Sequence, residues 1–197
     1  GQTSSVAITN PNAVLGTTYT WIVLSSPNVT GAAGGSGTII NQLLTSSDGI
    51  NTGTVTYEIT PSANGCSGST TNVMVTVNPI PNAFASNASI CSGATTNVAI
   101  TNPNGVLSGP IVYNWLVQSS SNVAGASAGI GSPIMQSLSV ADGINPGFVT
   151  YQITPSALGC SGATYSVTAT VLPIPILTAT NNIAATICNS TQTNITV

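Results

Sequence analysis

Hydrophobic and polar residues alternate along most of this chain, with the period of two that is typical of β-strands with one buried face. In residues 147–155, for example, Val149, Tyr151 and Ile153 alternate with threonine and glutamine. The same pattern predicts strands near residues 83–91, 96–102, 111–118, 133–140 and 164–172. Gly, Pro and Asn favour turns and are frequent between these segments. The pattern therefore predicts an all-β chain.

The inward-facing positions of these segments form the predicted core. Trp115 lies between an inward tyrosine and an inward valine, and Trp21 has equivalent neighbours. We therefore expect Trp21, Tyr57, Trp115 and Tyr151 to be core residues, and their register disfavours the alternative that the tryptophans stack on a sugar. The other inward positions are Val6, Ile8, Tyr19, Val23, Ile40, Leu44, Val55, Ile59, Val73, Val75 and Val77, followed by Val98, Ile100, Tyr113, Val117, Ile134, Leu138, Val149, Ile153, Val167, Ala169 and Val171.

The chain repeats itself, which indicates a tandem array. Val-Thr-Tyr-Glu-Ile-Thr-Pro-Ser-Ala at 55–63 returns as Val-Thr-Tyr-Gln-Ile-Thr-Pro-Ser-Ala at 149–157, an offset of 94 positions. Ahead of Tyr19 and Tyr113 the offset is 92, because the second copy carries two extra residues near Gly109. Pro-Ile-Pro at 79–81 recurs at 173–175, and Ile-Cys at 90–91 recurs at 187–188.

These matches divide the chain into three parts. Residues 1–78 are expected to form a repeat that lacks its first strand, and residues 79–172 a complete repeat. Residues 173–197 are expected to be the first strands of a third repeat. About 94 residues of mostly short strands is the size of an immunoglobulin-like sandwich, so we expect tandem sandwiches of that type.

Charge is almost absent, and this excludes several functions. Only 2% of the residues are charged, against about 25% in an ordinary soluble domain, and there is no Lys, Arg or His. Binding of nucleic acid or of anionic lipid requires cationic side chains, and the common zinc and copper sites require histidine. No apolar run approaches the roughly 20 residues of a membrane helix, so no direct membrane insertion is expected. Ser, Thr and Asn, 74 residues in all, must keep the chain soluble.

The acidic residues offer little chemistry. The Asp-Gly-Ile-Asn segments that begin at Asp48 and Asp142 are calcium-loop candidates, but calcium needs about six to eight oxygen ligands. We interpret them as turns in which Asp caps backbone amides. Glu58 could pair with Asp48 as in a glycosidase, but Gln152 stands at the equivalent position. A Ser or Cys nucleophile has no His or Lys as a base, so we expect no enzyme, no metal and no cofactor.

Cysteine usage suggests an oxidising exterior. Cys91 and Cys188 precede the predicted second strand of a repeat, whereas Cys66 and Cys160 follow the long strand near its end. The sandwich topology places Cys91 and Cys160 about 30 Å apart, beyond the 4.4–6.8 Å between Cα atoms that a disulfide tolerates. We therefore expect inter-repeat bonds, from Cys160 to a cysteine just ahead of Gly1 and from Cys91 to the third repeat. An intra-repeat bond and free thiols stay open as alternatives.

One set of motifs carries a resemblance. The motifs that carry the resemblance are Ile-Cys-Ser-Gly at 90–93, Tyr-Asn-Trp at 113–115 and the segment that ends in Gly-Cys-Ser-Gly at 159–162. The chain resembles PKD-like, immunoglobulin-like repeats of giant Bacteroidetes cell-surface proteins, of the gliding-motility adhesin type. The Trp-Asp-Phe-Gly-Asp-Gly signature of standard PKD domains is absent, because Leu116 and Val117 follow Trp115. The resemblance implies a secreted protein at the outer membrane-associated cell surface, with a role in adhesion or gliding.

We therefore expect structural spacer repeats in the stalk of an extracellular adhesin or filament, whose partners are neighbouring repeats of the same chain and, as a further candidate, a surface polysaccharide. Two alternatives stay open. The first is a subunit of a filament that assembles by strand donation, because a first strand is missing at the start and an extra one follows at the end. The second is a polysaccharide-binding module, which would require exposed aromatic side chains.

Overall fold

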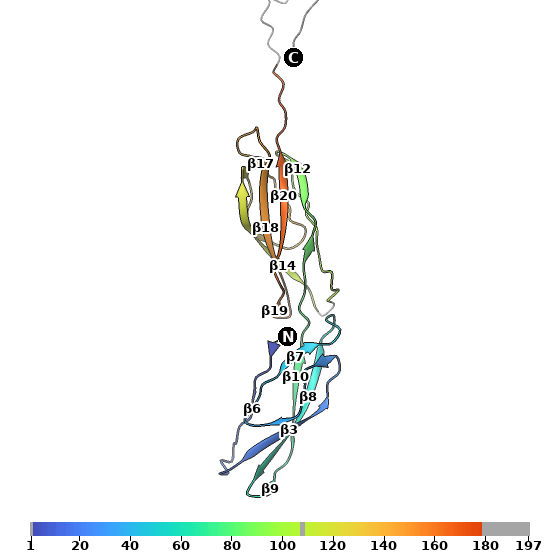
Figure 1. Ribbon diagram of the computed structural model, residues 1–197, viewed down its shortest axis with the longest axis vertical. Helices are drawn as coiled ribbons and strands as arrows, with labels where there is room; N and C mark the ends of the chain where they lie inside the picture. The colour runs from blue at the N-terminus through green and yellow to red at the C-terminus, as the bar shows by residue number, and fades with distance from the viewer. Residues whose placement is uncertain (1, 107–108, 179–197) are drawn as a thin grey trace, which may run out of the picture.

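The computed structural model describes residues 2–106 and 109–178. The chain forms tandem immunoglobulin-like β-sandwiches, stacked end to end along the long axis of the molecule (Figure 1). None of the residues described forms a helix that is long and apolar enough to span a membrane.

In the first repeat, one sheet has the strand order β10-β8-β3-β5. Its members are β10 (Thr71–Val77), β8 (Gly53–Ala63), β3 (Thr18–Ser25) and β5 (Gly35–Ser36), and β9 (Cys66–Ser67) folds back on β8. The facing strands are β1 (Gln2–Thr3), β7 (Leu43–Ser46), β4 (Val29–Thr30), β2 (Val6–Ala7) and β6 (Ile39–Ile40). They pair in the orders β1-β7-β4 and β2-β6.

The second repeat has the same sheet with one more strand, in the order β12-β20-β18-β14-β16. Its members are β12 (Ala88–Cys91), β20 (Tyr165–Leu172), β18 (Gly147–Ala157), β14 (Val112–Ser121) and β16 (Gly129–Ile130), and β19 (Cys160–Ser161) pairs with β18. The facing side contains β11 (Phe84–Ala85), β13 (Ile100–Thr101), β15 (Val123–Ala124) and β17 (Ser139–Val140), with isolated bridges at Thr95–Ser137 and Val98–Ile134.

Each repeat has its own hydrophobic core between its two layers. Tyr57 and Tyr151 are fully buried, and Trp21 and Trp115 are only 7% and 8% exposed. The alternating pattern of the long strands β8 and β18 accounts for this, because every second side chain of a strand points to the same face. The indole rings therefore fill the sandwiches.

The glycine-rich runs 31–37 and 124–132 contribute β5 and β16, short strands at the edge next to β3 and β14. A Cβ atom added to Gly35 would lie 2.7 Å from the Trp21 ring, and one added to Gly129 would lie 2.6 Å from the Trp115 ring. Any larger side chain would collide with the indole. The runs are poor in side chains because the backbone passes directly over a tryptophan.

The edge next to the last strand distinguishes the two repeats. In the second repeat, β12 pairs in parallel with β20, with Ala88 opposite Ala169 and Cys91 opposite Leu172. In the first repeat, no strand among the described residues covers the outer edge of β10. Residues 173–178 form no strand, and the remainder of the expected third repeat, 179–197, lies outside the described residues.

Candidate functional site at the repeat junction and the open strand edge

The two predicted acidic turns are capped by their own aspartates. Oδ1 of Asp48 accepts hydrogen bonds from the backbone N–H groups of Ile50 and Asn51, both at 2.9 Å. Oδ2 accepts from the Asn51 side chain at 2.8 Å. These hydrogen bonds, that of the Asn51 N–H foremost, hold the pKa of the Asp48 carboxyl well below its ordinary value. Both oxygens of the Asp48 carboxylate therefore accept hydrogen bonds that stabilise the turn.

An asparagine that sequence reasoning missed ties each turn to the preceding loop. Nδ2 of Asn122 donates to Oδ1 of Asp142 at 2.9 Å and to the carbonyl of Asn145 at 2.8 Å, and Asn28 makes the same contacts with Asp48 and Asn51. Asn122 adopts a φ of 55°, in the left-handed region that asparagine tolerates better than most residues. The sequence feature that could have identified this asparagine is its recurrence at the same position in both repeats. For Asp142, as for Asp48, the surrounding hydrogen bonds lower the carboxyl pKa, led here by that of the Asn145 side chain.

Glu58 lies on β8, opposite Ile22 on one side and Asn72 on the other. Its strand neighbours supply no second carboxyl, and the oxygens of Asp48 are engaged in the turn. Among the described residues, no three His, Cys, Asp or Glu side chains gather as a metal site would require.

The cysteines lie at the ends of the sandwiches. Cys91 pairs with Leu172 at the end of β20, whereas Cys160 pairs with Ala157 at the end of β18. The 11 residues of β18 separate these ends by about 36 Å, too far for a disulfide between Cys91 and Cys160. Cys66, Cys91 and Cys160 form no disulfide in the structure, and Cys188 lies outside the described residues.

The junction between the repeats is short and packed. β10 ends at Val77, Nδ2 of Asn78 donates to the carbonyl of Leu158 in the second repeat at 3.2 Å, and Pro79 is buried. A cleft of about 400 Å³ lies here, bordered by Thr3 and Asn78 from the first repeat and by Cys160 from the second. Cys160 thus faces the first repeat.

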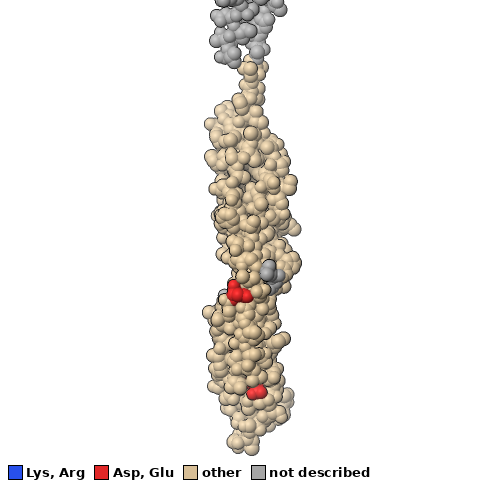
Figure 2. Space-filling view, turned by 90° about the vertical axis from the view of Figure 1, so that its right-hand side faces the viewer, with Lys and Arg blue, Asp and Glu red and all other residues tan. Residues whose placement is uncertain are grey.

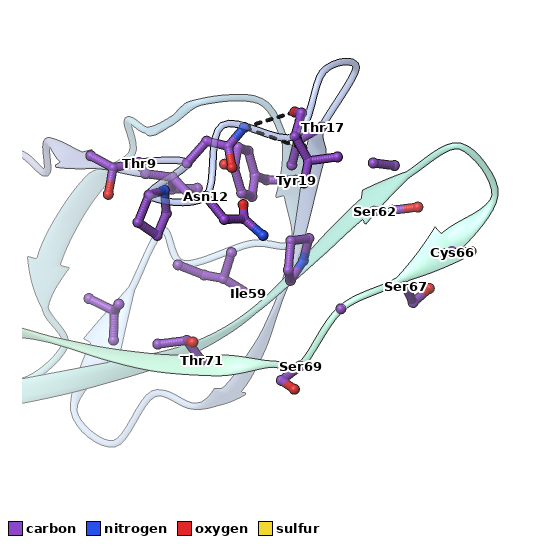
Figure 3. A pocket seen from close by; sticks show the side chains of 18 of the residues that line it. Thr9, Asn12, Thr17, Tyr19, Ile59, Ser62, Cys66, Ser67, Ser69 and Thr71 are labelled. Atoms are coloured by element: carbon purple, nitrogen blue, oxygen red, sulfur yellow. Dashed lines mark hydrogen bonds between the residues drawn. The ribbon is translucent and has the colours of Figure 1, made fainter.

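A second, larger cavity of about 720 Å³ lies at the other end of the first repeat (Figure 3). It runs between the segment that contains Ile8 and Asn12 and the strands β8 and β10, and Tyr19 and Ile59 form part of its wall. Both cavities border β10, the larger one at Val73 and the junction cleft at Val75, Thr76 and Val77. Both cavities therefore lie beside β10, whose outer edge is not covered by a strand among the described residues.

Fold and site together define a class of protein, a tandem array of all-β sandwich repeats with packed junctions. The chain belongs to the PKD-like domain family, whose model matches residues 1–81 and 88–175.

A comparison with solved structures matched extracellular cadherin domains, at low identity and low TM-score. Mouse cadherin-23 EC22–24 is 12% identical with a TM-score of 0.33, and the match covers 85% of this chain and 58% of that one. Chicken VE-cadherin EC1–2 is 12% identical with a TM-score of 0.31, covering 89% and 93%. Protocadherin gamma B2 domains 3–6 are 13% identical with a TM-score of 0.32, and the match covers 79% of this chain and 41% of that one. The chain thus spans less than half of that solved chain. A comparison with curated protein sequences found no match.

Proposed function

We propose that this chain is a stretch of the stalk of a long extracellular cell-surface protein, in which the sandwiches are spacers that hold an adhesive part away from the cell. The observation that carries the proposal is the end-to-end stack with a packed junction, in which Pro79 is buried and Asn78 is bonded to Leu158. A short, packed connection restricts bending between repeats, as a projecting stalk requires. Membership of the PKD-like family is consistent with a structural module.

The surface supports the same role. Figure 2 shows a face that is almost without charge, with isolated acidic atoms and no cationic ones. Interactions between surface charges depend on salt, so a rod with so few charges is nearly insensitive to the ionic strength around a cell. The absence of Lys and Arg also leaves trypsin-like proteases no cleavage site.

The finer assignment follows the sequence resemblance to gliding-motility adhesins. It comprises an outer membrane-associated location, a role in adhesion or gliding, and no catalytic activity. The tryptophans give no support to direct binding of polysaccharide, because Trp21 and Trp115 are buried in the cores. Neighbouring repeats are the partners that the junction supports.

Two measurements test the proposal. An antibody raised against the chain should label intact, non-permeabilised cells, and labelling only after permeabilisation would contradict an extracellular stalk. Small-angle X-ray scattering of the chain should give the maximum dimension of two sandwiches in line. A variant with a Gly-Ser linker inserted between Asn78 and Pro79 should sample bent shapes. Equal flexibility of both proteins would argue against a spacer.

A further inference from the structure

We infer that Asn78 and Leu158 are a matched pair through which the first repeat specifies the repeat that follows it. Asn78 holds the turn at Leu158 in a conformation that this turn would not keep unaided. The partner that the second repeat fits is thus a repeat that presents a side-chain amide just after its last strand. This pairing goes beyond the spacer function, because it assigns the choice of neighbour to two residues.

The turn between β18 and β19 consists of Leu158 and Gly159, and the flanking residues Ala157 and Cys160 pair with each other. Both turn residues have a positive φ, 50° for Leu158 and 79° for Gly159. A two-residue turn of this kind favours Asn-Gly, because most side chains are disfavoured in the left-handed region and asparagine tolerates it better. A leucine at this position therefore raises the free energy of the turn.

The first repeat has the same turn with the favoured residues. Asn64 and Gly65 have φ values of 53° and 81°, and they lie between the paired residues Ala63 and Cys66. The two turns thus share one backbone conformation and differ in the residue at the first turn position. Because the hairpin itself does not require a leucine, the reason for Leu158 must lie in what the turn contacts.

The Leu158 side chain packs against another segment of the second repeat. A Cβ atom added to Gly109 would lie 3.1 Å from Cδ2 of Leu158. The corresponding contact of the first repeat is looser, since a Cβ atom added to Gly16 would lie 4.0 Å from Oδ1 of Asn64. Leucine therefore provides an apolar contact with Gly109, but it lacks the preference for the left-handed region that asparagine gives to the turn.

The first repeat supplies a hydrogen bond to this turn. Nδ2 of Asn78 donates to the carbonyl of Leu158 at 3.2 Å. Oδ1 of Asn78 accepts from the Thr52 hydroxyl at 3.2 Å, which orients the amide so that its NH2 group faces the second repeat. The direction of a turn carbonyl depends on the backbone conformation of the turn. An amide fixed on the first repeat therefore favours the left-handed conformation of Leu158.

Asn78 and Thr52 have defined positions on the main sheet of the first repeat. Asn78 directly follows β10, and Thr52 directly precedes β8. The adjoining residues of these strands, Val77 and Gly53, pair with each other. The donor is thus fixed relative to the whole sandwich, and a repeat that docks there must bring a carbonyl to that position.

Each member of the pair is absent from the other repeat. At the offset of 94 positions, Leu172 stands where Asn78 stands, and Asn64 stands where Leu158 stands. A feature that every repeat needs for its own fold would recur in both copies. The amide donor and the leucine turn instead meet at this junction, as we expect of two residues that depend on each other.

Hydrogen exchange of the full chain, measured by NMR, tests the pair at two matched amides. The N–H of Gly162 donates to the carbonyl of Pro155 beside the Leu158 turn, and the N–H of Gly68 donates to that of Pro61 in the equivalent hairpin, both at 2.8 Å. Asn78→Leu should accelerate exchange at Gly162 by roughly 5- to 30-fold, the equivalent of one disfavoured left-handed residue, and leave Gly68 unchanged. Asn78→Asp should act alike, because a carboxylate has no proton to donate. Unchanged exchange at Gly162 in both variants would overturn the inference.

A second substitution distinguishes the matched pair from a general loosening of the junction. In the Asn78→Leu background, Leu158→Asn creates the favoured Asn-Gly turn, so exchange at Gly162 should slow again although the hydrogen bond between the repeats is still absent. Thr52→Val should accelerate exchange at Gly162, because the Asn78 amide is then less well oriented. If Leu158→Asn fails to slow exchange in that background, the turn does not depend on the amide and the pairing is wrong. None of these rates depends on where antibodies label cells.

Discussion

The hydroxyl of Tyr151 donates a hydrogen bond to Oε1 of Gln136 at 2.5 Å, and Tyr57 and Gln42 form the same pair at 2.7 Å in the first repeat. Gln136 also donates through Nε2 to the carbonyl of Ser127 at 2.6 Å and accepts from its N–H at 3.1 Å. A buried tyrosine of the central strand is thereby connected to the glycine-rich run at the sheet edge. The glutamine holds that run over the tryptophan.

Replacing Gln136 by Leu should lower the free energy of unfolding of the second repeat by about 1–3 kcal/mol, because it leaves the buried Tyr151 hydroxyl without an acceptor. The double variant Tyr151→Phe with Gln136→Leu should recover part of that loss, since both polar partners are then gone. Denaturant unfolding measures both. Equal destabilisation in the single and the double variant would contradict this account.

Trp115→Ala should lower the free energy of unfolding by roughly 3–5 kcal/mol, because it empties the middle of the sandwich. Leu116→Ala is the matched control on the same strand, and its outward side chain is 48% exposed, so its effect should be small. Calorimetry of the two variants checks the difference. Similar losses would mean that the core does not depend on the indole.

The Tm should be nearly constant from about pH 5 to pH 9, because no group with a shifted pKa titrates there. Hydrogen bonds lower the pKa of Asp48 and Asp142, so their contribution is present above the unfolded value near 4 and is lost as the pH falls further. Burial raises the pKa of Tyr57, Tyr113 and Tyr151, so stability falls again above about pH 10. A step in Tm near pH 6–7 would contradict this profile.

Calcium at millimolar concentration should leave the Tm unchanged, because the oxygens of Asp142 already accept hydrogen bonds and few other carboxylates are near. Asn122→Ala should lower the Tm in the presence and in the absence of calcium, since it removes the contacts that close the turn. A calcium-dependent rise of several degrees in the unmodified protein would show that the turn binds the ion.

Sequence reasoning was most informative where one face of a long strand is buried. The alternation around Tyr57 and Tyr151 indicated their inward direction, and both side chains are buried in the structure. The same reasoning placed Cys91 and Cys160 at opposite ends of their repeat, as the strand registers do. Their disulfide partners stay a prediction.

The edges of the sheets could not be read from the pattern. β5 and β16 have no alternation of hydrophobic and polar residues. Gly35 and Gly129 are required there because each contacts an indole ring that is distant in sequence. Gln136 and Asn122 were missed for a related reason, since a polar residue that satisfies a loop looks like any other polar surface residue. Only their recurrence as Gln42 and Asn28 distinguished them.

The parallel pairing of β12 with β20 determines how a repeat bears a mechanical load. Tension along the chain pulls the second repeat at Pro79 in one direction and at Leu172 in the other, so the two adjacent strands are drawn past each other lengthwise. The hydrogen bonds between Ala88–Cys91 and Ala169–Leu172 lie across that pull, and they must rupture together instead of opening one after another. β12 is therefore the strand that resists unfolding of the repeat under tension. A sandwich without such a strand should extend at much lower force than one that contains it.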